Sequence, residues 1–236
     1  MLSNNIDMRL LIDLNSMVSH NDHSLKIVYF IGNNLLVRGF PVFFSVVALW
    51  FSSDDRRRRS RMLIGLLATT VATILSVWMQ YHLAIHIRPF LDPTLHIHGI
   101  DPHLIVGWGS DRLNSFPSDS VTLFFSLATV IFLENRIAGC IAFLWSLVAI
   151  GISRVAMGWH YPSDIAGGLL LGIACVYLCT RIRPLRGFFE RLLLRCEPRI
   201  YLIHVLVFFF LADAYTSFAG LQGFYLAFGT ICGYLI

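Results

Sequence analysis

The chain has 236 residues, of which 56% are hydrophobic and 14% are charged, and its formal net charge is +4. A soluble domain carries about 25% charged residues, so this composition excludes an ordinary soluble protein and favours an integral membrane protein. The positive charge does not indicate nucleic-acid binding, because the arginine runs lie beside apolar segments and serve membrane topology. The length suits one all-α domain, residues 1–236, with about six membrane-spanning helices.

The N-terminal residues predict a helix that lies on the membrane rather than across it. Residues 8–18 have an amphipathic pattern, which is typical of helices in the membrane interface. The first twenty residues include Asp7, Arg9 and Asp13 and have no uninterrupted apolar core, so we expect no secretory signal peptide.

Apolar segments separated by short polar stretches follow along the chain. We expect residues 25–35 to lie in the interface, and whether the short apolar end, residues 223–236, crosses the membrane stays open. The six expected spans are residues 36–51, 62–87, 117–133, 137–157, 163–180 and 200–214.

The arginines predict the orientation of these spans. If the spans alternate in direction, twelve of the eighteen basic residues fall on one side, which is then cytoplasmic by the positive-inside rule. These twelve are Arg56, Arg57, Arg58, Arg59, Arg61, Arg136, Arg181, Arg183, Arg186, Arg191, Arg195 and Arg199.

The opposite, non-cytoplasmic side collects the chemically reactive residues. Arg88 ends the second span, residues 118–120 begin the third, Arg154 ends the fourth, and His160 and Asp164 begin the fifth. Four such boundaries on one side predict a shared site. Polar residues at span ends, rather than at mid-membrane, make a transporter or channel the less favoured interpretation.

The residue types in this site indicate phosphate chemistry. Two arginines suit a dianionic ligand, and the helix start at Pro117, Ser118 and Asp119 can add backbone N–H groups, although a simple N-cap would use the same residues. A neutral His160 oriented by Asp164 can attack phosphorus, although a structural role for such Arg, His and Asp residues stays open.

This hypothesis is phosphoryl transfer through a phosphohistidine. It needs no metal and no cofactor, because the arginines and the helix N-terminus supply the positive charge. The cysteines are expected to be buried free thiols rather than metal ligands. They are Cys140, Cys175, Cys179, Cys196 and Cys232.

The spacing of Ser153, Arg154, His160 and Asp164 matches the motif Ser-Arg-x5-His-x3-Asp. With it, the chain resembles the type 2 phosphatidic acid phosphatase family of membrane phosphatases, related to vanadium haloperoxidases, over residues 36–180. The resemblance implies that His160 is the nucleophile and Asp164 its orienter. It also implies a set of phosphate-binding residues, which are Arg88, Pro117, Ser118, Asp119, Ser153 and Arg154.

The Pro-Ser-Asp spelling and the Arg-Pro-Phe context are similar to the branch that acts on undecaprenyl diphosphate. Enzymes of that branch work at the outer face of the bacterial inner membrane, which agrees with the arginine distribution. The resemblance therefore implies membrane lipids and a lipid phosphate or diphosphate as the binding partners.

Two positions depart from the family pattern. Tyr81 stands seven residues before Arg88, where the family has lysine, and the nearby His82 and His86 are not at that spacing. Ser120 stands where the family has the histidine that protonates the leaving oxygen, a role that serine fills poorly. Histidines of the long loop that follows Arg88 are possible substitutes, namely His96, His98 and His103.

The Ser120 departure favours a diphosphate substrate. A diphosphate expels a phosphate monoester, whose second pKa is about 6, and this group leaves without a strong acid, whereas a phosphate monoester must expel an alkoxide. Two alternatives stay open: a phosphotransferase that passes the phosphoryl group to a lipid acceptor, and a catalytically silent relative that binds phospholipids. A native or an engineered His-to-Ser change would produce the same site.

Overall fold

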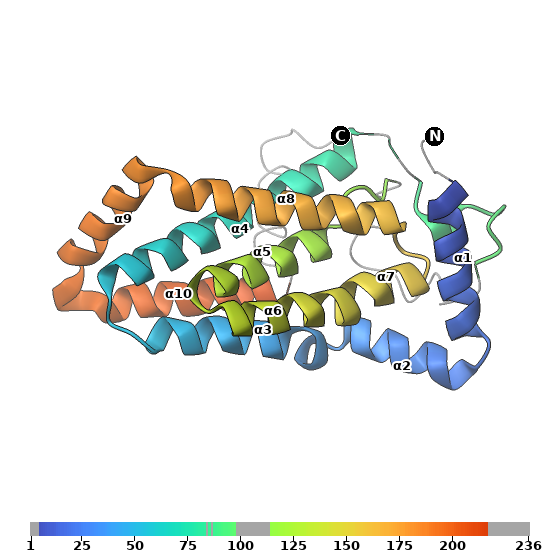
Figure 1. The fold of residues 1–236 in the computed structure, drawn as a ribbon, viewed down its shortest axis with the longest axis horizontal. Helices are drawn as coiled ribbons and strands as arrows, with labels where there is room; N and C mark the ends of the chain where they lie inside the picture. Colours follow the sequence, from blue (N-terminus) through green and yellow to red (C-terminus); the bar gives the residue numbers. More distant parts are fainter. Residues whose placement is uncertain (1–4, 84, 86, 98–113, 217–236) are drawn as a thin grey trace, which may run out of the picture.

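The computed structural model describes residues 5–83, 85, 87–97 and 114–216, and every regular element in that part of the chain is helical. Most helices run side by side along one axis, whereas α1 (Asn5–Ser19) crosses one end and α9 (Arg183–Arg195) crosses the opposite end (Figure 1). The predicted all-α membrane bundle is therefore confirmed.

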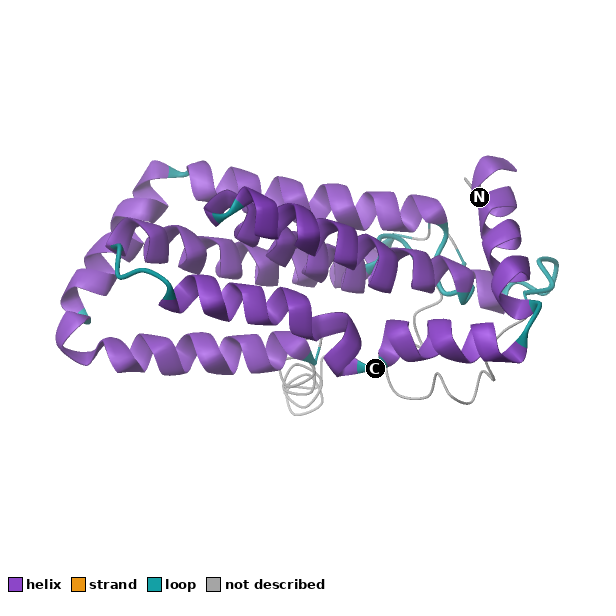
Figure 2. Cartoon of the chain, turned by 60° about the horizontal axis from the view of Figure 1, so that its bottom comes forward, coloured by secondary structure: helices purple, strands orange, loops and turns teal. Residues whose placement is uncertain are grey.

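The elements follow one another with short connections, and Figure 2 shows how few loops join the described helices. The fourth predicted span consists of three consecutive elements, α6, η3 and α7, in which η3 is a π-helical turn. The helices after α1 are α2 (Asp22–Asn33), α3 (Leu35–Phe51), α4 (Arg56–His82), η1 (Pro89–Leu91), α5 (Asp119–Glu134), α6 (Arg136–Ser146), η3 (Leu147–Ile152), α7 (Ser153–Ala156), α8 (Pro162–Arg181), α9 (Arg183–Arg195), η4 (Glu197–Arg199) and α10 (Ile200–Tyr215).

Five segments of the described chain are long and apolar enough to cross a membrane. Apolar side chains such as Phe44, Ile141 and Leu170 are exposed on the outside of the bundle, as expected for a surface that faces lipid. The chain is therefore an integral membrane protein. The five segments are Asp22–Phe51, Arg56–His82, Arg136–Ala156, Pro162–Arg181 and Glu197–Tyr215.

The predicted third span is α5, which has 16 residues and is the central helix of the bundle. Every residue from Val121 to Ile131 is buried, and α5 packs against α4, α6 and α8. The contact with α8 is close because α8 presents Gly168 and Gly172, where a Cβ atom would lie 2.6 Å from Ser118 O and 2.7 Å from Thr122 O. These glycines bring the N-terminal ends of α5 and α8 together.

Two helix boundaries differ from the predicted span boundaries. The helix of the second span begins at Arg56, before residue 62, because the Asp55 carboxylate accepts a hydrogen bond from Arg57 N and starts α4 within the arginine run. The segment before the first span is not a separate interfacial stretch. Only Asn34 interrupts α2 and α3, which form one candidate span, and its side chain caps α3 by accepting from Val37 N.

The N-terminal helix α1, which includes the predicted amphipathic helix of residues 8–18, crosses one end of the bundle and takes part in its packing. Leu11 is fully buried, and two polar side chains bond to distant backbone groups. Asp7 Oδ1 accepts a hydrogen bond from Ser163 N at 3.0 Å, and Asn15 Nδ2 donates one to Ala156 O at 2.9 Å. Residues 223–236, the uncertain last segment, lie outside the described residues.

Candidate active site

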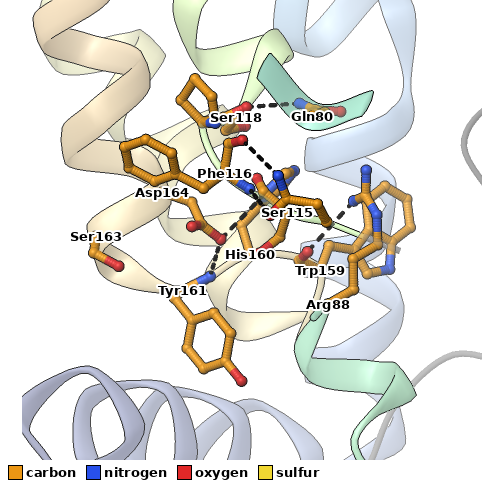
Figure 3. Close-up of polar contacts among 12 residues, drawn as sticks. Gln80, Arg88, Ser115, Phe116, Ser118, Trp159, His160, Tyr161, Ser163 and Asp164 are labelled. Atoms are coloured by element: carbon orange, nitrogen blue, oxygen red, sulfur yellow. Dashed lines mark hydrogen bonds and ion pairs between the residues drawn. The ribbon is translucent and has the colours of Figure 1, made fainter. Parts of the chain in front are cut away.

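The predicted site residues lie at the same end of the bundle as α1. Figure 3 shows the start of α5, the connection between α7 and α8, and the turn after α4 converging on His160. This end therefore joins segments that are far apart in the sequence, including those of Arg88 and Asp164.

His160 lies in the connection between α7 and α8, with 3% of its surface exposed. Its Nδ1 donates a hydrogen bond to Ser115 O at 2.9 Å. Because a carbonyl oxygen only accepts, this contact places the ring proton on Nδ1 and leaves the lone pair of the neutral imidazole on Nε2. Nε2 is therefore the nitrogen that is available for nucleophilic attack.

Asp164 stands at 3.6 Å from His160 Nδ1, which is longer than a normal hydrogen bond. Its Oδ2 instead accepts from Tyr161 N at 2.8 Å, at the start of α8. The carboxylate thus caps the helix and lies beside the imidazole. The Ser115 carbonyl, which makes the shorter contact with the ring, was missed because a backbone acceptor has no sequence signature.

Hydrogen bonds to backbone carbonyl groups hold the start of α5 against α4 and α8. Ser118 N donates to Asp164 O at 3.1 Å, and Gln80 Nε2 donates to Pro117 O at 2.6 Å. Asn114 completes the connection with an amide hydrogen bond to Leu83 O. The segment that carries Ser115 is therefore fixed on both sides, and with it the orientation of His160.

Arg154 lies in α7 and is 6% exposed. Its guanidinium carbon lies 4.2 Å from the centre of the Trp159 ring, and its Nε has no hydrogen-bond partner among the described residues. The π-helical turn η3 directly precedes α7, and such turns occur frequently at functional sites. Arg154 is thus a buried cation packed on an aromatic ring.

Arg88 follows α4 and reaches the same connection. Its Nη1 donates to Trp159 O at 3.5 Å, and it lies close enough to influence both His160 and Arg154 electrostatically. The turn after Arg88 is held by a hydrogen bond from Phe90 N to Gly158 O at 2.9 Å. Gly158 has φ = 70°, a conformation that favours glycine and lets the chain turn towards His160.

The start of α5 presents polar groups to the same region. Ser118 is fully buried, and its hydroxyl has no hydrogen-bond partner among the described residues. The Asp119 carboxylate accepts from Ser120 N at 2.8 Å and acts electrostatically on Arg154 and His160. The backbone N–H groups at the start of a helix form a favourable site for an anion.

Burial lowers the pKa of His160 below its ordinary value, and Arg88 lowers it further. The Asp164 and Asp119 carboxylates act in the opposite direction without reversing the shift. The lowered pKa keeps the imidazole neutral at neutral pH, which is the form that attacks phosphorus.

No hydrogen bond within the described chain joins several of the predicted site residues to His160. The Ser153 hydroxyl donates to Ala149 O at 2.8 Å within its own helix, so this proton is not offered to a ligand. The Ser120 hydroxyl makes no hydrogen bond within the described chain. His82 is exposed and stacks on Trp78, with ring centres 4.7 Å apart.

The remaining candidate substitutes are less informative. His96 is exposed on the loop after η1, and His86, His98 and His103 lie outside the described residues. Among described residues, no group of three or more His, Cys, Asp or Glu side chains is placed to hold a metal ion.

Comparison with known proteins agrees with the motif spacing. The PAP2 superfamily matches residues 61–188, which is more than half of the chain and runs from within α4 through α5 and α8. No solved structure gave a significant match.

Two curated relatives show the extent of the similarity. The chain is 31% identical to the bacitracin transport permease protein BcrC of Bacillus licheniformis over 71% of this chain and 75% of the relative. It is 28% identical to the undecaprenyl-diphosphatase BcrC of Bacillus subtilis over 66% of this chain and 74% of the relative. With the match over α4 to α8, these similarities establish that the chain belongs to the PAP2 superfamily.

Proposed function

We propose that this protein is a phosphatase of lipid diphosphates, with undecaprenyl diphosphate as the favoured substrate. The observation that carries the proposal is the buried, neutral His160, whose Nδ1 is held by Ser115 O beside the two cations Arg88 and Arg154. A relative named undecaprenyl-diphosphatase supports the choice of lipid.

In the first step, His160 Nε2 attacks the terminal phosphorus of the diphosphate. The bond between that phosphorus and the bridging oxygen breaks, and the lipid monophosphate leaves with the bonding electrons. Arg88, Arg154, the Ser118 hydroxyl and the N–H groups at the start of α5 stabilise the charge on the transferring phosphoryl group.

In the second step, water attacks the phosphohistidine, inorganic phosphate is released, and His160 returns to its neutral form. The first step needs no strong acid for the leaving group, because a phosphate monoester has a second pKa of about 6. In the second step the leaving group is the imidazole of His160, which departs as a neutral base because its Nδ1 keeps the proton. This chemistry is compatible with Ser120, whose hydroxyl is a poor proton donor at neutral pH.

The site faces away from the cytoplasm in this proposal. The connections that carry the arginine runs lie at the end of the bundle opposite α1, around α9 and the start of α4 (Figure 1). By the positive-inside rule that end is cytoplasmic, so His160 acts on lipid at the outer side of the bacterial inner membrane.

The test is phosphate release from undecaprenyl diphosphate by the detergent-purified protein. We expect His160→Ala to lower the rate by about a thousandfold or more, because the nucleophile is removed. His20→Ala, which changes an exposed histidine between α1 and α2, serves as the control. Equal release by wild type and His160→Ala would reject the proposal, and labelled phosphate on a second lipid would indicate transfer instead of hydrolysis.

A second measurement tests the substrate class. Ser120→His restores the acid position of the family pattern, so we expect it to raise the rate with a lipid monophosphate more than the rate with a diphosphate. If wild type is silent with both substrates and Ser120→His is active, the native protein is a binding relative rather than an enzyme.

A further inference from the structure

Trp159 directly precedes His160 in the chain and contacts both arginines of the candidate site. The guanidinium carbon of Arg154 lies over its ring, 4.2 Å from the ring centre. The Trp159 backbone carbonyl accepts a hydrogen bond from Arg88 Nη1 at 3.5 Å (Figure 3). A single residue therefore links the two cations to the connection that carries His160.

The turn after α7 brings this ring back over Arg154. Trp159 N donates to Arg154 O at 3.0 Å, and Gly158 N donates to Val155 O at 2.9 Å. Gly158 has the positive φ that reverses the chain, and its carbonyl accepts from Phe90 N at 2.9 Å on the other side. The backbone that carries the ring is therefore fixed by the fold itself.

Arg154 is held by this ring and not by its N–H donors. It is 6% exposed, and no hydrogen bond or ion pair within the described chain involves its guanidinium. Arg61 gives the contrast, since its Nε and Nη2 both donate to Glu134 at 2.9 Å. An aromatic ring holds a guanidinium by its face, whereas a carboxylate holds it by its N–H groups. The Glu134 carboxylate thus occupies donors of Arg61, and the Trp159 ring leaves those of Arg154 unused.

The unused donors of Arg154 match the chemistry of phosphate. A guanidinium presents a planar fork of N–H groups that suits the oxygens of a phosphoryl group. The Nε of Arg154 is buried and has no hydrogen-bond partner among the described residues, and such a donor is costly to leave unsatisfied. The phosphoryl group that His160 attacks supplies oxygens that can accept these N–H groups.

We propose that Trp159 is a positioning residue for phosphate binding: its ring holds Arg154 by the guanidinium face and keeps the N–H edge free for the oxygens of the phosphoryl group. The inference rests on the proposed function, since it concerns the same phosphate. The Trp159 ring touches Arg154 rather than the phosphate, so its effect on the ligand passes through that arginine.

The experiment measures the affinity of the full-length protein in detergent for orthovanadate, a phosphate analogue, together with thermal unfolding and phosphate release. Trp159→Leu removes the ring, and Trp159→Phe keeps a ring but removes the indole N–H. Trp159→Leu is also made in the Arg154→Gln background. Tyr177→Leu is the matched control, because the Tyr177 ring also lies under an arginine, 4.7 Å from the guanidinium carbon of Arg181, at the opposite end of the bundle.

We expect Trp159→Leu to weaken vanadate binding by about threefold to thirtyfold, the range that loss of a cation–π contact gives. Trp159→Phe should lose less, since a phenyl ring also attracts a guanidinium, and Tyr177→Leu should match wild type. In the Arg154→Gln background, Trp159→Leu should have no further effect, because its partner is already gone.

Four results reject the role of Trp159 and leave the phosphatase in place when His160→Ala is inactive. One is a Trp159→Leu variant that binds vanadate like wild type. Another is an equal loss with and without Arg154→Gln, which would show that the effect does not pass through Arg154. A loss in Trp159→Phe as large as that in Trp159→Leu would assign the effect to the indole N–H instead of the ring face. If Trp159→Leu does not fold, Trp159→Met replaces it, and failure of both to fold makes Trp159 structural.

The proposed function fails in a different way. Equal phosphate release by wild type and His160→Ala, with vanadate binding that still depends on Trp159 and Arg154, would reject the phosphatase and support Trp159 in an anion site. A wild type that neither binds vanadate nor releases phosphate would remove both proposals.

Discussion

The two ends of the helix bundle hold arginines in opposite environments. At the end around α9, arginines form ion pairs with carboxylates: Arg61 with Glu134 at 2.9 Å and Arg56 with Glu197 at 3.1 Å. At the end around His160, Arg154 is 6% exposed and lies on the Trp159 ring. Several arginines of the α9 end thus have carboxylate partners, whereas Arg154 is buried against an aromatic ring.

This difference shows how charge is used in the two regions. Arginines at the α9 end satisfy membrane topology, and those of the ion pairs have a carboxylate partner. At the His160 end, the buried Arg154 and the nearby Arg88 contribute positive charge that an anion can balance. We therefore expect substitutions at the α9 end to change stability and substitutions at the His160 end to change activity.

The largest effect is expected from Arg154→Gln. Loss of this buried cation should lower kcat/KM for undecaprenyl diphosphate by about a hundredfold to a thousandfold, because it stabilises the transferring phosphoryl group. The control is Arg181→Gln, since Arg181 also lies on an aromatic ring, 4.7 Å from the centre of Tyr177, but at the opposite end. Equal losses in the two variants would remove the distinction between the ends.

The pH dependence of kcat/KM should report the buried state of His160. The reaction needs the neutral imidazole, and burial and Arg88 lower its pKa, so activity should persist below the pH at which an ordinary histidine becomes protonated. Activity falls only as the pH drops through the lowered pKa. The stability of the fold depends on pH in the same direction. The contribution of the neutral, buried His160 to stability is present above the ordinary histidine pKa and is lost as the pH falls through the folded-state pKa. An acid limb at or above the ordinary histidine value would contradict the assignment.

Glu134→Gln should be the most damaging of the substitutions at the α9 end. The Glu134 side chain is 3% exposed and pairs with both Arg58 and Arg61, so its loss leaves two partly buried cations without their carboxylate. We expect the free energy of unfolding to fall by about 2 kcal/mol, measured by denaturant unfolding in detergent. Vanadate affinity should stay at the wild-type value, and a parallel loss of affinity would show that the two ends are coupled.

The smallest effect is expected from Glu197→Gln. Its partner Arg56 and Glu197 itself have side-chain exposures of 44% and 65%, and exposed ion pairs contribute little to stability. The same unfolding measurement should give a change of less than about 0.5 kcal/mol. A loss as large as that of Glu134→Gln would mean that burial does not separate these two pairs.

The sequence alone determined the membrane class, the helices, the arginine-rich end and the spacing of Arg154, His160 and Asp164. These features are local or periodic: apolar runs of span length, charges at span ends and residues within one connection. The difference between the predicted start at residue 62 and the helix start at Arg56 is also local, because the single residue Asp55 caps α4.

Only the tertiary structure decided which distant groups complete the site. Ser115 O holds His160 across 45 residues of sequence, and Asn15 of α1 bonds to Ala156 across 141. The reason is physical: such contacts depend on how helices pack, and the close approach of α5 to α8 at Gly168 and Gly172 sets that packing.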